Sequence, residues 1–232
     1  MLTLQPIAVI HNDLTQKFGI PRQSGMAMHS LSRIVFLPDY RQAEALRGLE
    51  GYSHLWLLWH FSEGDTQVWS PTVRPPRLGG NRRMGVFATR SPYRPNPVGL
   101  SCVRLERVVL QSADGPYLEV SGADLMNGTP IFDIKPYLPY TDAHPEARGG
   151  FGEPEVDKRL QVSVPSAMRP LLSDSQWEAL EELLAMDPRP GYQHDDAREY
   201  AMSWAGYNVR FRVIGSENRL CVTAVELLYH TK

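Results

Sequence analysis

The residues best suited to chemistry in this sequence gather in one stretch, 84–101, which reads MGVFATRSPYRPNPVGLS. It contains Arg90, Arg94 and Asn96, whose side chains can bind an anionic group such as a phosphate or a carboxylate. Prolines at positions 92, 95 and 97 restrict the backbone and exclude a helix through the loop. A stiff loop of this composition is typical of a site that presents side chains to a ligand. The alternative is a proline-rich connection whose arginines are only solvated.

The charge around this loop indicates a polyanionic partner. Asp and Glu are absent from positions 66–105, and the same window contains the arginines Arg74, Arg77, Arg82, Arg83, Arg90, Arg94 and Arg104. The whole chain has a formal net charge of only -2. Because local fields rather than the total charge attract a phosphate backbone, we expect this region to bind nucleic acid.

The composition is typical of a folded globular protein. The chain has 232 residues, of which 42% are hydrophobic, enough for one large or two modest domains. No run approaches the roughly 18 apolar residues of a membrane helix, and the first residues contain no positively charged leader. We therefore expect a soluble, cytoplasmic protein. Cys102 and Cys221 lie in strand-like apolar contexts, which favours buried free thiols, and no Cys/His spacing indicates a metal site.

Short strands must position these residues. Apolar runs and alternation predict strands at 4–10, 32–37, 51–61, 86–88, 98–110, 117–122, 130–135, 207–214 and 220–228. The segment 51–61 is apolar enough to be buried on both faces or to close a barrel. Helical spacing predicts a short helix at 40–49 and a second helix at 173–186, which Ser173 and Gln176 begin with a capping box.

The order of these elements predicts a mainly β protein. We expect an antiparallel β-barrel domain over residues 1–140, a linker over 141–165 and a small α+β domain over 166–232. The phosphate-binding motifs GxGxxG and GxxxxGK[ST] are absent from the sequence, as are GxSxG and HExxH. The residues alone thus predict a β-rich domain that binds an anionic partner, and they leave its reaction open.

Several motifs together resemble one family. GVFATRSPYRPNPVGLS, PRQ at 21–23, TVRPPRLGGN at 72–81 and DLMNGTPIFDIKPYLPY at 124–140 are similar to motifs of the TsaA-like family called TrmO, and the similarity resumes at DPRPGY and YNVRFRV. Members of this family are S-adenosylmethionine-dependent tRNA methyltransferases. The resemblance implies a homodimer of β-barrels that binds the cofactor without a Rossmann fold. It also implies methylation of N6 of threonylcarbamoyladenosine at position 37, in threonine tRNA.

The resemblance further implies which residues hold the cofactor. They are Pro21, Arg22, Gln23, His60, Phe61, Arg90, Leu100, Asp124, Leu125, Met126 and Asn127. An arginine suits the methionine carboxylate, carbonyls and aromatic faces suit the sulfonium, and an apolar slot suits adenine. Asn127 departs from the family, which usually has Asp at this place, so we expect a weaker contact there.

The implied reaction requires the loss of a proton from a urea-like nitrogen. We nominate Asp133 as the base or orienting group, with Lys135 and Tyr137 holding the substrate. Asp133 and Lys135 are two residues apart, so they share one face of a strand. The alternative is that these two side chains form a structural ion pair.

Arginines outside the cofactor motifs are candidates for contacts with the tRNA backbone. They are Arg74, Arg77, Arg82 and Arg83 in the loop before the central motif, and Arg210 and Arg212 in the C-terminal domain. The first group could instead cross a dimer interface, and the second could be the solvated face of a strand. Trp56, Trp59 and Trp69 are expected in the core or a dimer interface before they act as base-stacking platforms.

A second class of function is compatible with the same motifs. The chain could be a non-catalytic RNA-binding or regulatory module that binds S-adenosylmethionine only as a ligand. Transfer of labelled methyl groups to tRNA would distinguish this module from an enzyme.

Overall fold

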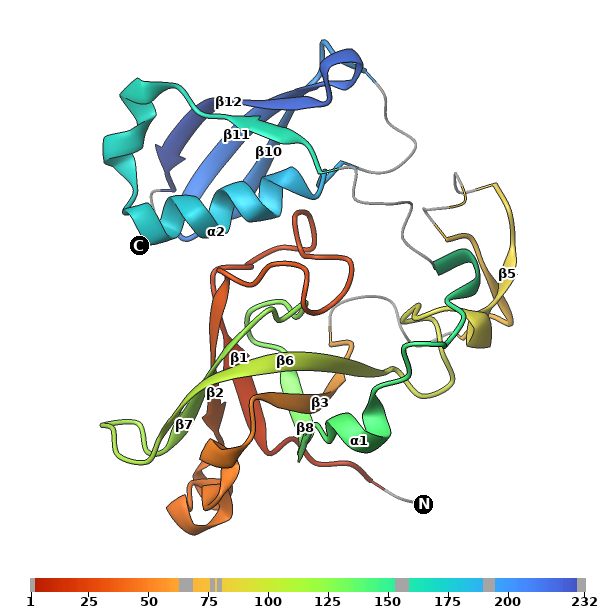
Figure 1. Cartoon of the computed structure of the whole chain (residues 1–232), viewed down its shortest axis with the longest axis vertical. Helices are drawn as coiled ribbons and strands as arrows, with labels where there is room; N and C mark the ends of the chain where they lie inside the picture. The colour runs from red at the N-terminus through yellow and green to blue at the C-terminus, as the bar shows by residue number, and fades with distance from the viewer. Residues whose placement is uncertain are drawn as a thin grey trace.

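The computed structural model describes residues 3–62, 69–75, 78, 81–152, 159–189 and 195–228, which form two β-sheet units (Figure 1). The first unit is a closed barrel of β1 (Ala8–His11), β2 (Leu31–Phe36), β3 (His54–His60), β6 (Val98–Val109), β7 (Tyr117–Ser121) and β8 (Pro130–Pro136). Its strands pair antiparallel in the order β1-β2-β7-β6-β3-β8, and β8 returns to β1. A separate ribbon consists of β4 (Thr72–Val73) and β5 (Met84–Gly85). The predicted antiparallel barrel is confirmed.

Alternating side chains fill the interior of the barrel. On β3, Leu55 and Leu57 are fully buried and Trp59 is nearly so, whereas the intervening residues such as Trp56 are half-buried. This strand pairs with β6 on one side and β8 on the other. It therefore closes the barrel, one of the two arrangements expected for 51–61. Burying each large aliphatic side chain contributes about 1.5–3 kcal/mol.

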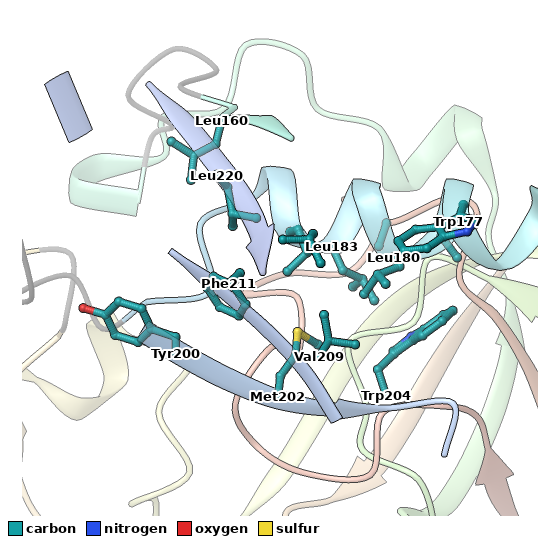
Figure 2. Close-up of a cluster of buried hydrophobic side chains, with 14 of the residues drawn as sticks. Leu160, Trp177, Leu180, Leu183, Tyr200, Met202, Trp204, Val209, Phe211 and Leu220 are labelled. Carbon is teal, nitrogen blue, oxygen red and sulfur yellow. The ribbon is translucent and has the colours of Figure 1, made fainter. Parts of the chain in front are cut away.

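The second unit is a four-stranded sheet covered by one helix (Figure 2). Its strands are β9 (Gln161–Ser163), β10 (Glu199–Trp204), β11 (Tyr207–Ile214) and β12 (Arg219–Leu227), in the order β10-β11-β12-β9. The helix α2 (Asp174–Ala185) begins at the predicted capping box, in which Ser173 and Gln176 each accept a backbone N–H of the other. Leu180 and Leu183 face the sheet and complete its core.

The loop between β1 and β2 connects the barrel to the second unit. Its residues Leu14 and Ala27 are buried in the core of the second unit. Phe18 stacks on Phe211 of β11, with ring centroids 6.3 Å apart. In Figure 1 this red loop lies between the barrel and α2. Because the loop contains the motif 21–23, the second unit helps to place that motif.

The helix predicted over 40–49 is wrong. The chain forms three short 3₁₀ turns there, η1 (Pro38–Tyr40), η2 (Ala43–Leu46) and η3 (Leu49–Gly51). Within 40–49 only Leu46 is fully buried, and Gly48 adopts a positive φ of 90°. A helix of this length is marginal in water without a buried face, so helical propensity alone does not sustain it.

The strand predicted over 86–88 is also wrong. These residues form the 3₁₀ turn η5 (Val86–Ala88), and the preceding strand β5 is limited to two residues. The backbone N–H of Thr89 donates to the carbonyl of Val86 at 3.1 Å, which closes the turn. Within this turn Val86 is buried, whereas Phe87 is exposed.

The range expected as a linker, 141–165, contains elements of both units. The short helix α1 (Pro139–Asp142) ends within it, and β9 pairs with β12 of the second sheet. Asp142 accepts hydrogen bonds from the Leu138 N–H and from Trp56 Nε1, both at 2.9 Å, and these bonds lower the pKa of its carboxyl. Through Asp142, α1 is held against the outer face of the barrel.

The two cysteines are free thiols, as expected, but each is half-buried rather than fully buried. Burial first, and the charge of Asp142 second, raise the pKa of the Cys102 thiol. Among the described residues, no cluster of three or more His, Cys, Asp or Glu side chains could hold a metal ion. In the same part of the chain, no helix has the length and apolar character needed to cross a membrane.

Candidate functional site

A groove with a volume of about 1210 Å³ lies beside the stretch 84–101. Arg22, Gln23 and Arg90, three of the predicted cofactor residues, line it. The rest of its lining comes from residues within 70–75, 83–93 and 149–152. Asp and Glu are absent from its described lining, so the arginines give the groove a positive charge.

Arg94 determines the shape of the central loop. Its Nη1 donates to the carbonyl oxygens of Val86 at 3.2 Å and Thr89 at 2.7 Å. The hydroxyl of Thr89 also donates to the Val86 carbonyl, at 2.8 Å. These bonds bend the backbone into η5 and explain why 86–88 is not a strand. Arg94 therefore has a structural contact inside the loop, whereas Arg90 lines the groove.

Two motifs far apart in the sequence meet at Arg90. Its Nη1 donates to Gln23 Oε1, and Gln23 Nε2 donates to the carbonyl of Arg22 at 2.6 Å. Arg22 Nη2 in turn donates to the carbonyl oxygens of Asp187 at 3.4 Å and Arg189 at 3.3 Å. These two carbonyls belong to the DPRPGY segment, so the second unit contributes directly to the position of Arg22.

A second hydrogen-bonded network ends at Asp124. Trp59 Nε1 donates to Ser101 Oγ at 2.9 Å, and Ser101 Oγ donates to Asp124 Oδ1 at 2.5 Å. Burial raises the pKa of the Asp124 carboxyl, while the hydrogen bond from Ser101 and the charge of Arg90 oppose this rise. A shielded carboxylate near an arginine is the kind of perturbed group that is common at functional sites.

The rest of the predicted turn, 125–127, makes structural contacts. Leu125 is 1% exposed and packs in the barrel core, and Met126 is half-buried. Asn127 Oδ1 accepts the backbone N–H of Asn12 at 3.1 Å. An amide oxygen is sufficient for that bond, so the neutral Asn127 is suited to the contact that it makes here.

The remaining predicted cofactor residues do not line the groove. The ring of Phe61 lies 4.3 Å from the ring of Trp59, which places Phe61 next to the Ser101–Asp124 network. His60 is half-buried and Pro21 is buried. Leu100 is 52% exposed. The predicted set is thus divided between the groove, the network that ends at Asp124 and the surrounding barrel.

The three predicted catalytic residues lie on or just after β8. Lys135 Nζ is 2.7 Å from Asp133 Oδ2, and these side chains are 62% and 44% exposed, respectively. The ring of Tyr137 lies 5.7 Å from the ring of Trp56. None of the three is among the described lining of the groove. The structural ion pair considered as the alternative is formed, and a role for Asp133 in proton transfer stays a prediction.

The arginines predicted to contact RNA from the upstream loop are in three situations. Arg74 and Arg83 line the groove, and Arg83 Nη1 donates to Thr72 Oγ1 at 3.3 Å. Arg82 is exposed. Arg77 lies outside the described residues. Two members of this group are therefore placed where a ligand in the groove would meet them.

The arginines predicted to contact RNA from β11 already have acidic partners. Arg210 Nη2 donates to both carboxylate oxygens of Glu226, each at 2.7 Å. Arg212 Nε is 3.9 Å from Glu199 Oε1. A phosphate at this face would compete with these carboxylates, which makes it a weaker candidate for binding RNA than the groove.

The sequence reasoning missed several residues of the site. The sequence does not single out Ser101, which connects Asp124 to Trp59; Trp59 itself lies in the barrel core, as expected, but its hydrogen bond to Ser101 is not foreseen. Strand alternation could have identified Ser101, because residues 99, 101 and 103 share the inward face of β6. Phe87 and Tyr93, which line the groove, were also missed because local sequence does not show which loop side chains remain exposed.

Gly99 allows Trp59 to lie against β6. A Cβ added at position 99 would be 2.2 Å from Trp59 Cε2. We expect Gly99→Ala to displace the indole from Ser101 and to lower the free energy of unfolding by about 1–3 kcal/mol, the usual cost of overpacking. Urea denaturation followed by tryptophan fluorescence measures this loss. Gly51→Ala is the control, because a Cβ there meets nothing within 4 Å. Equal stability of the two variants would contradict the prediction.

Comparisons with known proteins cover both units. The chain matches the family model described as tRNA-methyltransferase O N-terminal domain over residues 9–143. It matches the model of the TrmO C-terminal domain over residues 157–228. These two matches correspond to the barrel and to the second sheet with its helix.

Individual relatives extend the similarity to nearly the whole chain. The chain is 41% identical to a tRNA (adenine(37)-N6)-methyltransferase of Escherichia coli K12, over 90% of this chain and 92% of the relative. It is also 41% identical to a Pseudomonas aeruginosa protein that is named as an S-adenosylmethionine-dependent methyltransferase, RcsF. This match covers 86% of this chain and 87% of that protein. A crystal structure of TrmO from Pseudomonas aeruginosa superimposes with a TM-score of 0.75 at 33% identity, covering 97% of this chain and 98% of that one.

Proposed function

This chain belongs to the TrmO family of tRNA methyltransferases, and on that premise we propose that it methylates N6 of adenosine 37 in tRNA with S-adenosylmethionine as the methyl donor. We further propose that the adenosine already carries a threonylcarbamoyl group, in threonine tRNA, and that the enzyme acts as a homodimer. The family motifs in 84–101 and 124–140 support these finer proposals.

The observation that carries the proposal is the convergence of Arg22, Gln23 and Arg90 at a positively charged groove. S-adenosylmethionine contains a carboxylate, an ammonium and a sulfonium, so its site needs side chains of both signs. Arg90 supplies a cation for the carboxylate, and Asp124 supplies a shielded anion near that cation. The residues present therefore fit the cofactor.

The proposed roles of the chain's own residues are binding and orientation. S-adenosylmethionine supplies, when bound, a methyl group on a positively charged sulfur. Arg90 would bind the carboxylate, Asp124 would bind a positively charged or hydroxyl group, and Phe61 would offer an aromatic face. Transfer to a nitrogen in line with the sulfur depends mainly on position, and good orientation can contribute about 7–11 kcal/mol of the barrier.

The acceptor nitrogen must lose its proton when it gains the methyl group. Asp133 is the proposed acceptor of that proton, with Lys135 and Tyr137 as substrate contacts. The ion pair with Lys135 holds the Asp133 carboxylate beside a second proposed substrate contact. Asp133→Ala decides between this role and a structural one, because methyl transfer that remains intact would assign the pair to structure alone.

The test of the proposed function is methyl transfer from labelled S-adenosylmethionine to defined tRNAs. We expect label in threonine tRNA that carries threonylcarbamoyladenosine at position 37, and none in the same tRNA with unmodified adenosine or with guanosine at that position. Label in the unmodified tRNA would exclude the threonylcarbamoyl requirement. Cofactor binding without label in any tRNA would favour the non-catalytic module. Light scattering on the same preparation measures whether the chain is a dimer.

A further inference from the structure

Two aromatic side chains on the wall of the groove are unusually exposed. Phe87 is 74% exposed and Tyr93 is 47% exposed, and both belong to the central loop. Leaving an apolar ring in water forgoes the free energy that its burial would contribute. An exposed aromatic pair beside a groove therefore indicates a ligand that covers it.

The loop holds the Phe87 ring and the backbone of Tyr93 in place before any ligand arrives. The guanidinium carbon of Arg94 lies 5.9 Å from the centre of the Phe87 ring. The same guanidinium is anchored on two carbonyls of the loop, so the support of the ring is itself fixed. The carbonyl of Tyr93 accepts the backbone N–H of Ser70, which ties the loop to the chain before β4. A pre-organised surface of this kind loses little conformational entropy when it binds.

The charges of the groove identify the class of ligand. Besides Arg22 and Arg90, which the proposed function assigns to the cofactor, Arg74 and Arg83 line it, and its described lining contains no carboxylate. Arginines together with exposed aromatic faces match single-stranded RNA, because phosphates pair with guanidinium groups and unpaired bases stack on rings. An RNA duplex does not offer its base faces to such rings.

We propose that Phe87 and Tyr93 form a stacking platform for unpaired bases of the tRNA anticodon loop beside adenosine 37, with Arg74 and Arg83 contacting the flanking phosphates. This inference rests on the proposed function, since it names how the same substrate is held. The platform recognises an open loop rather than a base sequence, because every base has a face that can stack.

The experiment measures RNA binding without cofactor, by fluorescence anisotropy with a labelled anticodon-loop hairpin. Phe87→Ala should weaken binding about 5- to 150-fold, the range that corresponds to one base–aromatic stack of about 1–3 kcal/mol. Phe87→Trp should restore it. Leu31→Ala is the matched control, because Leu31 is also largely exposed, at 61%, but lies on β2 outside the groove lining. A fully paired duplex should bind wild type and Phe87→Ala equally.

Three results would overturn the platform. The first is hairpin affinity unchanged by Phe87→Ala. The second is a loss of S-adenosylmethionine affinity that equals the loss of RNA affinity, which would make Phe87 part of the cofactor site. The third is a change of molecular mass in light scattering, which would assign the aromatic pair to contact with a second copy of the chain. If wild type methylates tRNA and Phe87→Ala binds the hairpin with the same affinity, only the platform is refuted. If wild type transfers no methyl group, the proposed function is refuted.

Discussion

Replacing Arg90 by alanine is expected to weaken S-adenosylmethionine binding about 10- to 100-fold and to lower methyl transfer at least as much. Arg90 is shared by two parts of the site, since it donates to Gln23 and its charge acts on Asp124. A hydrogen bond to a charged group contributes about 1.5–3 kcal/mol. Alanine removes this contribution and leaves the methionine carboxylate of the cofactor without a nearby opposite charge. Isothermal titration with the cofactor and initial rates with tRNA measure the two effects.

Two further variants make the Arg90 result specific. Arg90→Lys keeps the charge but loses the planar fork of donors, so we expect it to recover only part of the affinity. Arg47→Ala is the control, because Arg47 is an exposed arginine that follows η2 and does not line the groove. If Arg90→Ala binds the cofactor with wild-type affinity, the proposed role of this arginine is wrong.

Asp124→Asn is expected to weaken cofactor binding about 10-fold or more without lowering Tm. Burial raises the pKa of this carboxyl above its unfolded value, so the charged form is a cost to the fold at neutral pH. That cost is full above the raised pKa and disappears as the pH falls through it toward the unfolded value. Asparagine never carries the charge, and its amide oxygen can still accept the hydrogen bond from Ser101. The variant should therefore equal or exceed wild type in Tm at neutral pH.

The pH dependence gives the Asp124 prediction a second measurement. Any advantage in Tm of Asp124→Asn should shrink as the pH is lowered through the raised pKa, because wild type then loses its buried charge. Cofactor affinity of wild type should fall over the same range, whereas that of the variant should stay constant. Thermal denaturation and cofactor titration over a series of pH values measure both trends. A variant that unfolds at lower temperature but keeps full affinity would make Asp124 a structural residue.

Local patterns predicted much of the fold. The alternation of 207–214 predicted β11 with its observed bounds, and the capping box at Ser173 and Gln176 predicted the start of α2. Both signals arise from neighbouring residues, so the sequence contains them completely. The errors at 40–49 and 86–88 have the opposite origin. At 40–49, weak burial removes the support that a helix would need. At 86–88, the hydrogen bonds of Arg94 override the local preference for a strand.

The candidate site was predictable in its residue types but not in its arrangement. The acid-free window and the proline-rich loop indicated an anion-binding surface, and the family motifs selected Gln23 and Arg90. That these two side chains meet depends on the loop between β1 and β2, which packs into the core of the second unit. Contacts between residues so far apart are set by packing, and no local pattern reports them.

The sequence by itself determined the chemistry that this protein can offer: a stiff loop rich in arginine inside a window without acidic residues, and a set of family motifs. Only the tertiary structure decided which charged side chains form ion pairs within the protein and which line the groove. Arg210 is paired with Glu226 and Asp133 with Lys135, whereas Arg90 lines the groove. The physical reason is that these pairings follow from the conformations of side chains and the register of folded strands, such as β11 against β12.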